Sequence, residues 1–106
     1  MTPLGEFELL VLLAVLRLKD DAYAVSVREE IEARSGRAAP RGSVYITLDR
    51  LTRKGYLHAV EAAGGAERGG RPKRVFSATT AGRAAVKDAL EALRRMQQGL
   101  AWRTLG

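Results

Sequence analysis

The chain has 106 residues with no cysteine and one histidine, and its 18 Lys and Arg against 12 Asp and Glu give a formal net charge of +6. This length suits one small domain with a core of its own, and the absence of Cys excludes disulfides, thiolate metal sites and cysteine nucleophiles. With His58 alone, no histidine-based metal cluster can form within one chain, so we expect no bound metal or cofactor and no catalytic residue.

The first predicted helix spans residues 4–18, with Thr2 as N-cap and Pro3 in the first turn. Its apolar side chains cover nearly the whole circumference. Such a helix cannot face water on any wide side, so it is either central to the domain or shared with a second subunit.

The longest apolar run in this helix, Leu9 to Leu16, has eight residues. A membrane-spanning helix needs roughly 20 consecutive apolar residues, so this run predicts a core helix. The N-terminus also lacks a basic leader and a small-residue cleavage motif. We therefore expect a soluble, cytoplasmic protein with no membrane contact.

A second helix is predicted from Asp20 or Asp21, acting as N-cap, to Ser35, with Gly36 at the usual stop position. The apolar spacing of Tyr23, Val27 and Ile31 marks its inner side. Five charged residues between positions 28 and 34 predict a solvated outer face.

A third helix is predicted from Arg41 to Lys54, between Pro40 and the terminating Gly55. At 100° per residue, Val44, Leu48 and Leu51 share one narrow arc, which predicts the side that faces the core. The opposite side carries Ser43, Ile46, Arg50 and Arg53. Its edges carry Tyr45, Asp49 and Thr52 on one side and Thr47 and Lys54 on the other.

The outer face of this third helix combines the groups that a helix in the DNA major groove uses. It offers cations for phosphates or guanine, short hydroxyls, and an apolar group for the thymine methyl. It also lies in the basic stretch 37–74, where nine Lys and Arg stand against three Asp and Glu. Each feature taken alone also has an interpretation without DNA binding. Ile46 can be a single exposed apolar residue, and the arginines can serve only to keep the surface soluble. Asp49 and Arg53 can form an ordinary surface ion pair.

Two short strands are predicted at Tyr56 to Ala62 and Arg74 to Thr79, joined by residues 63–73. Four cations lie at the end of this connection, namely Arg68, Arg71, Lys73 and Arg74. They favour a basic wing on the DNA backbone or in the minor groove. The alternative is a flexible loop whose charges only aid solubility.

A last helix is predicted from Ala81 to about Arg103, capped by Thr79 or Thr80. Its apolar residues average 3.5 residues per turn, which is typical of a short coiled-coil seam. Together with the first helix this predicts a homodimer; the alternative is a helix folded back onto its own domain. The predicted dimerisation residues are Leu9, Leu12, Leu13, Leu16, Val86, Leu90, Leu93, Met96 and Leu100. Trp102 either lines a ligand pocket at the interface or simply fills it.

The predicted order is helix, helix, helix, hairpin, helix. We therefore predict a mainly α fold with a small β-hairpin, a winged helix-turn-helix followed by a C-terminal dimerisation helix. Residues 1–79 would form the DNA-binding domain and residues 80–106 the dimerisation helix.

Four segments resemble the PadR family of bacterial transcriptional regulators: LGEFELLVLLAVL, DDAYAVSVREEIEARSGR, GSVYITLDRLTRKGYL and RGGRPKRVFSATTAGRAA. The run Gly-Ser-Val-Tyr-x-x-Leu-x-x-Leu-x-x-x-Gly-Tyr-Leu, with Thr-x-x-Gly after the wing, is the most specific part. The likeness spans nearly the whole chain. Two departures are the final helix, shorter than the tail of some members, and Ala24, where relatives often have Gly.

The resemblance implies a dimeric repressor that binds an inverted-repeat operator and is released by a ligand or stress signal, although no small molecule need be involved. It implies DNA contacts by Ser43, Tyr45, Thr47 and Arg50, and by Arg71 and Lys73 in the wing.

The main hypothesis is a homodimeric regulator that reads double-stranded DNA. The predicted contacts are Arg41, Ser43, Tyr45, Ile46, Thr47, Arg50, Arg53, Lys54, Arg68, Arg71, Lys73 and Arg74. The alternative is a winged-helix protein-interaction module without sequence-specific DNA binding. An enzyme is disfavoured, because His58 lies in a predicted strand with no nucleophile beside it.

Overall fold

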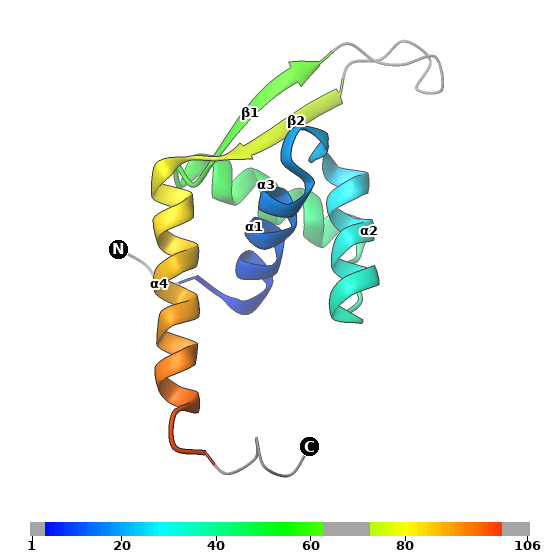
Figure 1. The fold of residues 1–106 in the computed structure, drawn as a ribbon. Coiled ribbons are helices and arrows are strands. Elements are labelled where there is room, and N and C mark those ends of the chain that lie inside the picture. Colours follow the sequence, from blue (N-terminus) through cyan, green and yellow to red (C-terminus); the bar gives the residue numbers. More distant parts are fainter. Residues whose placement is uncertain (1–3, 63–72, 101–106) are drawn as a thin grey trace.

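The computed structural model describes residues 4–62 and 73–100, and its elements follow the predicted order. They are α1 (Glu6–Leu18), the short 3-10 helix η1 (Lys19–Asp21), α2 (Ala24–Ser35), α3 (Arg41–Arg53), β1 (Leu57–Ala62), β2 (Lys73–Ala78) and α4 (Thr80–Gln97). Figure 1 shows α1 between α2 and α4, with the hairpin lying across one end of the helices. The predicted mainly α fold with a small hairpin is confirmed.

The start of α1 differs from the prediction. Gly5 is the N-cap, and the Glu8 Oε1 atom accepts a hydrogen bond of 2.9 Å from the Gly5 N–H. A carboxylate three residues after the cap satisfies a backbone donor that the helix leaves open, so the helix begins at Glu6. The prediction that Leu4 is helical was wrong, and the proposed caps Thr2 and Pro3 lie outside the described residues.

The start of α2 also differs from the prediction. Asp20 and Asp21 belong to η1, and the N-cap of α2 is Tyr23, whose N–H donates to Ser26 Oγ at 3.0 Å. The Ser26 hydroxyl donates in turn to the Asp21 carbonyl at 2.6 Å. The start of α2 is therefore capped by a buried serine that belongs to the helix itself. The predicted end is confirmed, since Gly36 adopts a left-handed conformation with φ of 71°.

The hydrophobic core forms around the inner side of α1. Val11 and Val15 pack with Val27 of α2, Leu48 of α3 and other buried residues. Leu12 and Val86, both predicted at a dimer interface, are 0% and 5% exposed and belong to this core. The structure therefore assigns these two side chains to the core of their own chain and leaves them little surface for contact with a second one.

The hairpin is fixed beside the start of α2. Its strands pair antiparallel from Leu57 opposite Ala78 to Ala62 opposite Lys73. The Phe76 N–H of β2 donates to the Ala22 carbonyl at 2.8 Å, and the Phe76 side chain is buried in the core. The strands begin within one residue of the predicted positions. The wing is thereby held against the segment that leads into α2.

Helix α4 begins at Thr80, one residue before the predicted Ala81, and ends earlier than predicted. Thr79 Oγ1 accepts a hydrogen bond of 3.0 Å from the Gly82 N–H, which confirms Thr79 as N-cap. The helix ends at Gln97 rather than near Arg103, because Gln98 is extended and Gly99 has a φ of 83°. Leu100 therefore lies beyond the helix, and the predicted seam loses its last position.

No helix among the described residues is both long and apolar enough to cross a membrane.

Gly82 is the point at which α4 meets the loop before β1. A Cβ atom at this position would overlap the Tyr56 carbonyl oxygen, a backbone atom that cannot move aside cheaply. We predict that Gly82→Ala lowers the free energy of unfolding by about 1–3 kcal/mol, measured by urea denaturation. Gly42→Ala is the matched control, since nothing lies within 4 Å of its Cβ position, and it should stabilise α3 by about 0.5–1 kcal/mol. Equal effects of the two substitutions would contradict this packing.

Candidate nucleic-acid interface

The outer face of α3 is exposed as predicted. Val44, Leu48 and Leu51 are buried in the core, so the opposite side of the helix faces solvent. Tyr45 and Ile46 are 52% and 58% exposed, and Ser43 is exposed beside them. An aromatic and an aliphatic side chain thus stand next to a hydroxyl on a solvated helix, which is the mixture suited to contacts with base edges and phosphates.

Thr47 is the exception on this helix. It was predicted at the outer edge, but only 4% of its surface is exposed. The helix turns Thr47 towards the first turn of α1, and Phe7 and Thr47 line the same shallow concavity together with Ile46 and Arg50. At 100° per residue Thr47 lies only about 40° from Leu51, at the edge of the buried stripe, and it is covered because a neighbouring helix packs beside that edge.

Asp49 joins α3 to the hairpin. Its carboxylate lies 3.0 Å from the Arg53 guanidinium, the predicted i, i+4 pair, and 3.9 Å from the Arg74 guanidinium of β2. Each group is about half exposed or more, so the pairs contribute little to stability. Their effect is geometric, because they keep two predicted DNA-contacting arginines on either side of one carboxylate.

Glu8 holds the other end of α3, and the sequence reasoning missed it. The whole residue is 8% exposed, and its Oε2 atom lies 2.9 Å from Lys54 Nζ and 3.9 Å from the Arg50 guanidinium. Burial alone would raise the pKa of Glu8, but the Gly5 N–H, the Lys54 ammonium and the Arg50 charge outweigh it and hold the pKa below its ordinary value. Lys54, predicted to contact a phosphate, is paired within the chain.

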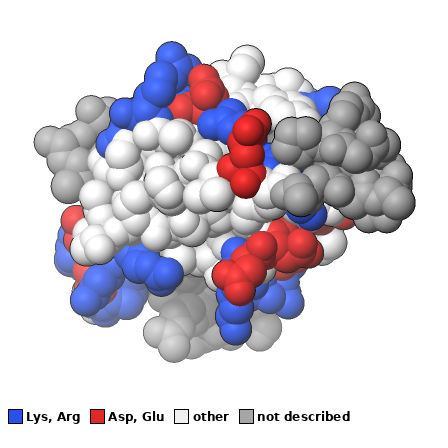
Figure 2. Space-filling view, turned by 90° about the horizontal axis from the view of Figure 1, so that it is seen from above, with Lys and Arg blue, Asp and Glu red and all other residues white. Residues whose placement is uncertain are grey.

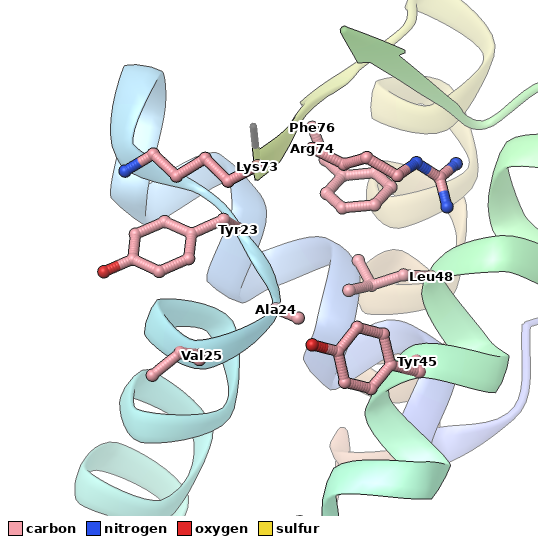
Figure 3. A pocket seen from close by; sticks show the side chains of 8 residues that line it. All are labelled: Tyr23, Ala24, Val25, Tyr45, Leu48, Lys73, Arg74 and Phe76. Carbon is pink, nitrogen blue, oxygen red and sulfur yellow. The ribbon is translucent and has the colours of Figure 1, made fainter. Parts of the chain in front are cut away.

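A cleft of about 210 Å³ opens between the start of α2, α3 and β2. Lys73 lies 4.0 Å above the Tyr23 ring, and Arg74 lies 5.1 Å from the centre of the Phe76 ring. Figure 3 shows the Tyr45 hydroxyl turned towards the α2 side, while the Lys73 and Arg74 head groups point to opposite sides. Aromatic rings thus position both cations at the rim of the cleft.

The charged face of α2 is less simply solvated than predicted. The Arg28 side chain donates to the Ala39 carbonyl at 2.9 Å, and a Glu32 carboxylate oxygen accepts from the Ala39 N–H at 3.0 Å. Both backbone groups of one residue just before α3 are therefore fixed by α2. These bonds fix where α3 begins relative to α2.

Charge is mixed on the face that bears the hairpin. Figure 2 shows Lys and Arg side chains at the margins of this view, around a centre of uncharged residues, with acidic side chains among them. The predicted wing cations Arg68 and Arg71 lie outside the described residues, and Lys73 and Arg74 lie at the start of β2. The predicted DNA-contacting cations that the structure does place lie in α3, at its C-cap Lys54 and at the start of β2.

Within residues 4–62 and 73–100, no three His, Asp or Glu side chains are grouped closely enough to hold a metal ion.

The chain is similar to known DNA-binding regulators. The sequence profile of the transcriptional regulator PadR-like family matches residues 12–88. No curated protein matches the chain in sequence.

Solved structures share its fold. A PadR family transcription regulator from hypervirulent Clostridium difficile R20291 is 20% identical with a TM-score of 0.75, the alignment covering 96% of this chain and 100% of that one. A PadR-like transcription factor from Bacteroides fragilis is 19% identical with a TM-score of 0.74, covering 89% and 85%. Bacillus subtilis PadR in complex with operator DNA is 17% identical with a TM-score of 0.67, covering 81% of this chain and 48% of that one.

The lowered pKa of Glu8 makes stability depend on pH. A carboxylate whose folded pKa lies below its ordinary value of 4.5 stabilises the fold above that pH, and the contribution is lost as the pH falls through the folded pKa. Glu6 and Glu30 also have lowered pKa values, because they accept hydrogen bonds from Arg37 and Arg17 respectively. We predict that Glu8→Gln flattens the fall in unfolding free energy between pH 5 and 3 without abolishing it. Urea titrations at several pH values test this, and an unchanged pH slope would contradict it.

Proposed function

The chain belongs to the PadR-like family of transcriptional regulators, and we propose that it binds an inverted-repeat operator as a homodimer and represses transcription from it. The family is one of DNA-binding regulators and not of enzymes. The observation that carries the proposal is the outer face of α3, where Ser43, Tyr45, Ile46 and Arg50 are exposed opposite the buried stripe. Bacillus subtilis PadR, which shares this fold, has been solved on operator DNA.

The residues of α3 divide by chemistry between bases and phosphates. Ser43 and Arg50 supply hydrogen-bond donors for base edges, and Ile46 supplies an apolar contact for a thymine methyl group. Arg41 and Arg53 reach the phosphates on either side, with Tyr45 as a hydroxyl donor. Thr47 is left out of the proposed contacts because its side chain is buried.

The cleft beside α2 is the proposed phosphate contact of the wing. The start of α2 carries backbone N–H groups that the helix does not use, and its dipole favours an anion. Lys73 and Tyr45 line the same cleft from β2 and α3. Arg74 lies next to Lys73 on β2, and Arg68 and Arg71 extend the proposed wing outside the described residues.

The dimer is proposed to form through α4. The face of α4 that is buried at Gly82 and Ala85 continues beyond the domain as Leu90, Leu93 and Met96, which are exposed. Figure 1 shows this half of α4 extending past the other elements. Leu9, Leu13 and Leu16 of α1 are half-buried and can add to the interface. Residues 80–106 would then serve as the dimerisation part and residues 1–79 as the DNA-binding part.

In the proposed dimer, two copies of α3 lie in successive major grooves, about 34–36 Å apart. A protein seated across an operator in this way blocks transcription, and a ligand or stress signal would release it. The effector is unidentified, and the proposed pocket at Trp102 lies outside the described residues.

A protein-interaction module is the second candidate. The mixed charge of the hairpin face favours it, since acidic side chains there would oppose a phosphate backbone. Selection of bound fragments from a random DNA pool separates the two functions. Enrichment of a sequence with twofold symmetry is expected for the regulator, whereas a pool that stays random after several rounds supports the module.

Arg50 should discriminate between sequences. We predict that Arg50→Ala weakens binding to the enriched fragment by about 1–3 kcal/mol and binding to a random duplex by less, measured by fluorescence anisotropy. Lys73→Ala should instead weaken both and lower the salt slope by about 0.9. Arg34→Ala is the control, since Arg34 pairs with Glu30 on the far end of α2. Equal losses on both duplexes for Arg50→Ala would remove Arg50 from base reading.

Leu93 tests the dimer. Leu93→Asp places a charge in the exposed apolar face of α4, and we predict that the dimer dissociation constant rises by roughly 30-fold or more, or about 2 kcal/mol. Sedimentation velocity measures this change. The matched control is Ala84→Asp, because Ala84 is exposed on the opposite side of the same helix. A dimer that survives Leu93→Asp would place the interface elsewhere.

A further inference from the structure

Glu8 is a buried carboxylate that pairs with two cations at the C-terminal end of α3, Arg50 within the helix and Lys54 at its C-cap. It lies in the first turn of α1, yet its Oε2 atom reaches Lys54 Nζ at 2.9 Å and the Arg50 guanidinium at 3.9 Å. The fold does not need an ion pair here to cap the helix, because Oε1 alone accepts the Gly5 N–H. The second oxygen is therefore committed to Arg50 of α3 and to Lys54 at the C-cap of that helix.

The first turn of α1, which carries Glu8, also borders the proposed DNA surface. Phe7 lines a shallow concavity of about 440 Å³ together with Ile46 and Arg50. The Lys54 and Arg50 side chains remain 31% and 50% exposed, whereas that of Glu8 is 10% exposed. The cations can thus leave the carboxylate and reach an anion in solution, but the carboxylate cannot follow them.

We propose that Glu8 is a specificity-determining residue that takes the place of a DNA phosphate for Lys54 and Arg50 until the correct sequence is bound. This inference rests on the proposed function. A phosphate on any duplex must compete with Glu8 for Lys54, so the sequence-independent part of DNA affinity is reduced. On the operator, Arg50 gains base contacts that a random duplex cannot offer, and these outweigh the attraction of Glu8.

Salt dependence provides the measurement. Each phosphate neutralised by a protein cation adds about 0.9 to the slope of log affinity against log salt. Removing the charge of Glu8 frees Lys54 for a phosphate. We predict that Glu8→Gln steepens the slope on a random 20-base-pair duplex by about 0.9 and raises affinity for it about 5- to 10-fold at 0.1 M salt. Binding to the enriched fragment gains less, so discrimination falls by roughly threefold or more.

Glu6→Gln is the matched control. Glu6 lies in the same helix two residues earlier, is exposed, and pairs with Arg37 at 2.6 Å. The substitution Glu6→Gln therefore changes the net charge of the protein by the same amount as Glu8→Gln, without removing a contact to α3. If Glu8→Gln and Glu6→Gln bind the random duplex alike, the effect of Glu8 is general electrostatics and the inference is overturned.

A second variant covers the case in which Glu8→Gln does not fold, as judged by thermal denaturation. Lys54→Gln in the otherwise unchanged protein should leave the salt slope on the random duplex unaltered, because Glu8 already occupies this cation. A slope lowered by about 0.9 would show that Lys54 contacts phosphate freely, and the inference would fail. Failure of the proposed function looks different: the unchanged protein would then show no preference for any enriched fragment over the random duplex.

Discussion

The structure depends on the burial of α1. Helices α2, α3 and α4 and strand β2 all contact this one helix, so its inner side chains are shared by most of the core. Val11, Leu12 and Val15 are almost completely enclosed, and apolar groups packed at this density leave few ways to arrange the surrounding elements. The outward direction of α3 follows, because its stripe of Val44, Leu48 and Leu51 must face α1, α2 and the hairpin.

Most of the fold could be predicted from the sequence, since apolar periodicity and capping residues act locally. The stripe of α3, the stop at Gly36 and the cap at Thr79 were all predicted correctly. The errors arose where a distant or unexpected partner decided the outcome. Ser26, a residue within α2, caps the start of that helix, whereas the sequence favoured Asp20 or Asp21 as the N-cap. The packing that encloses Leu12 and Val86 cannot be predicted from helical spacing alone.

The candidate site was only partly predictable. The exposed positions of α3 follow from the direction of its buried stripe, but the partners of its cations do not. Glu8 lies 46 residues before Lys54 and reads as an ordinary first-turn acid. The sequence did carry one signal, a glutamate three residues after Gly5, between the apolar residues Phe7 and Leu9, where a charge that becomes buried needs partners. The prediction that Thr47 is exposed was wrong because a neighbouring helix covers its edge of α3.

Backbone contacts fix the start of α4, and the direction set there determines where the far end of the helix lies. Gly82 abuts the Tyr56 carbonyl, and the Thr79 hydroxyl donates to the Gly55 carbonyl at 2.6 Å, so backbone contacts set the angle at which the helix leaves the domain. With 18 residues, α4 is about 27 Å long. It therefore acts as a lever: a tilt of roughly 5° at its base displaces the far end by about 2 Å. In the proposed dimer, sequence changes around the base of α4 would alter the distance between the two copies of α3 without touching any proposed DNA-contacting residue.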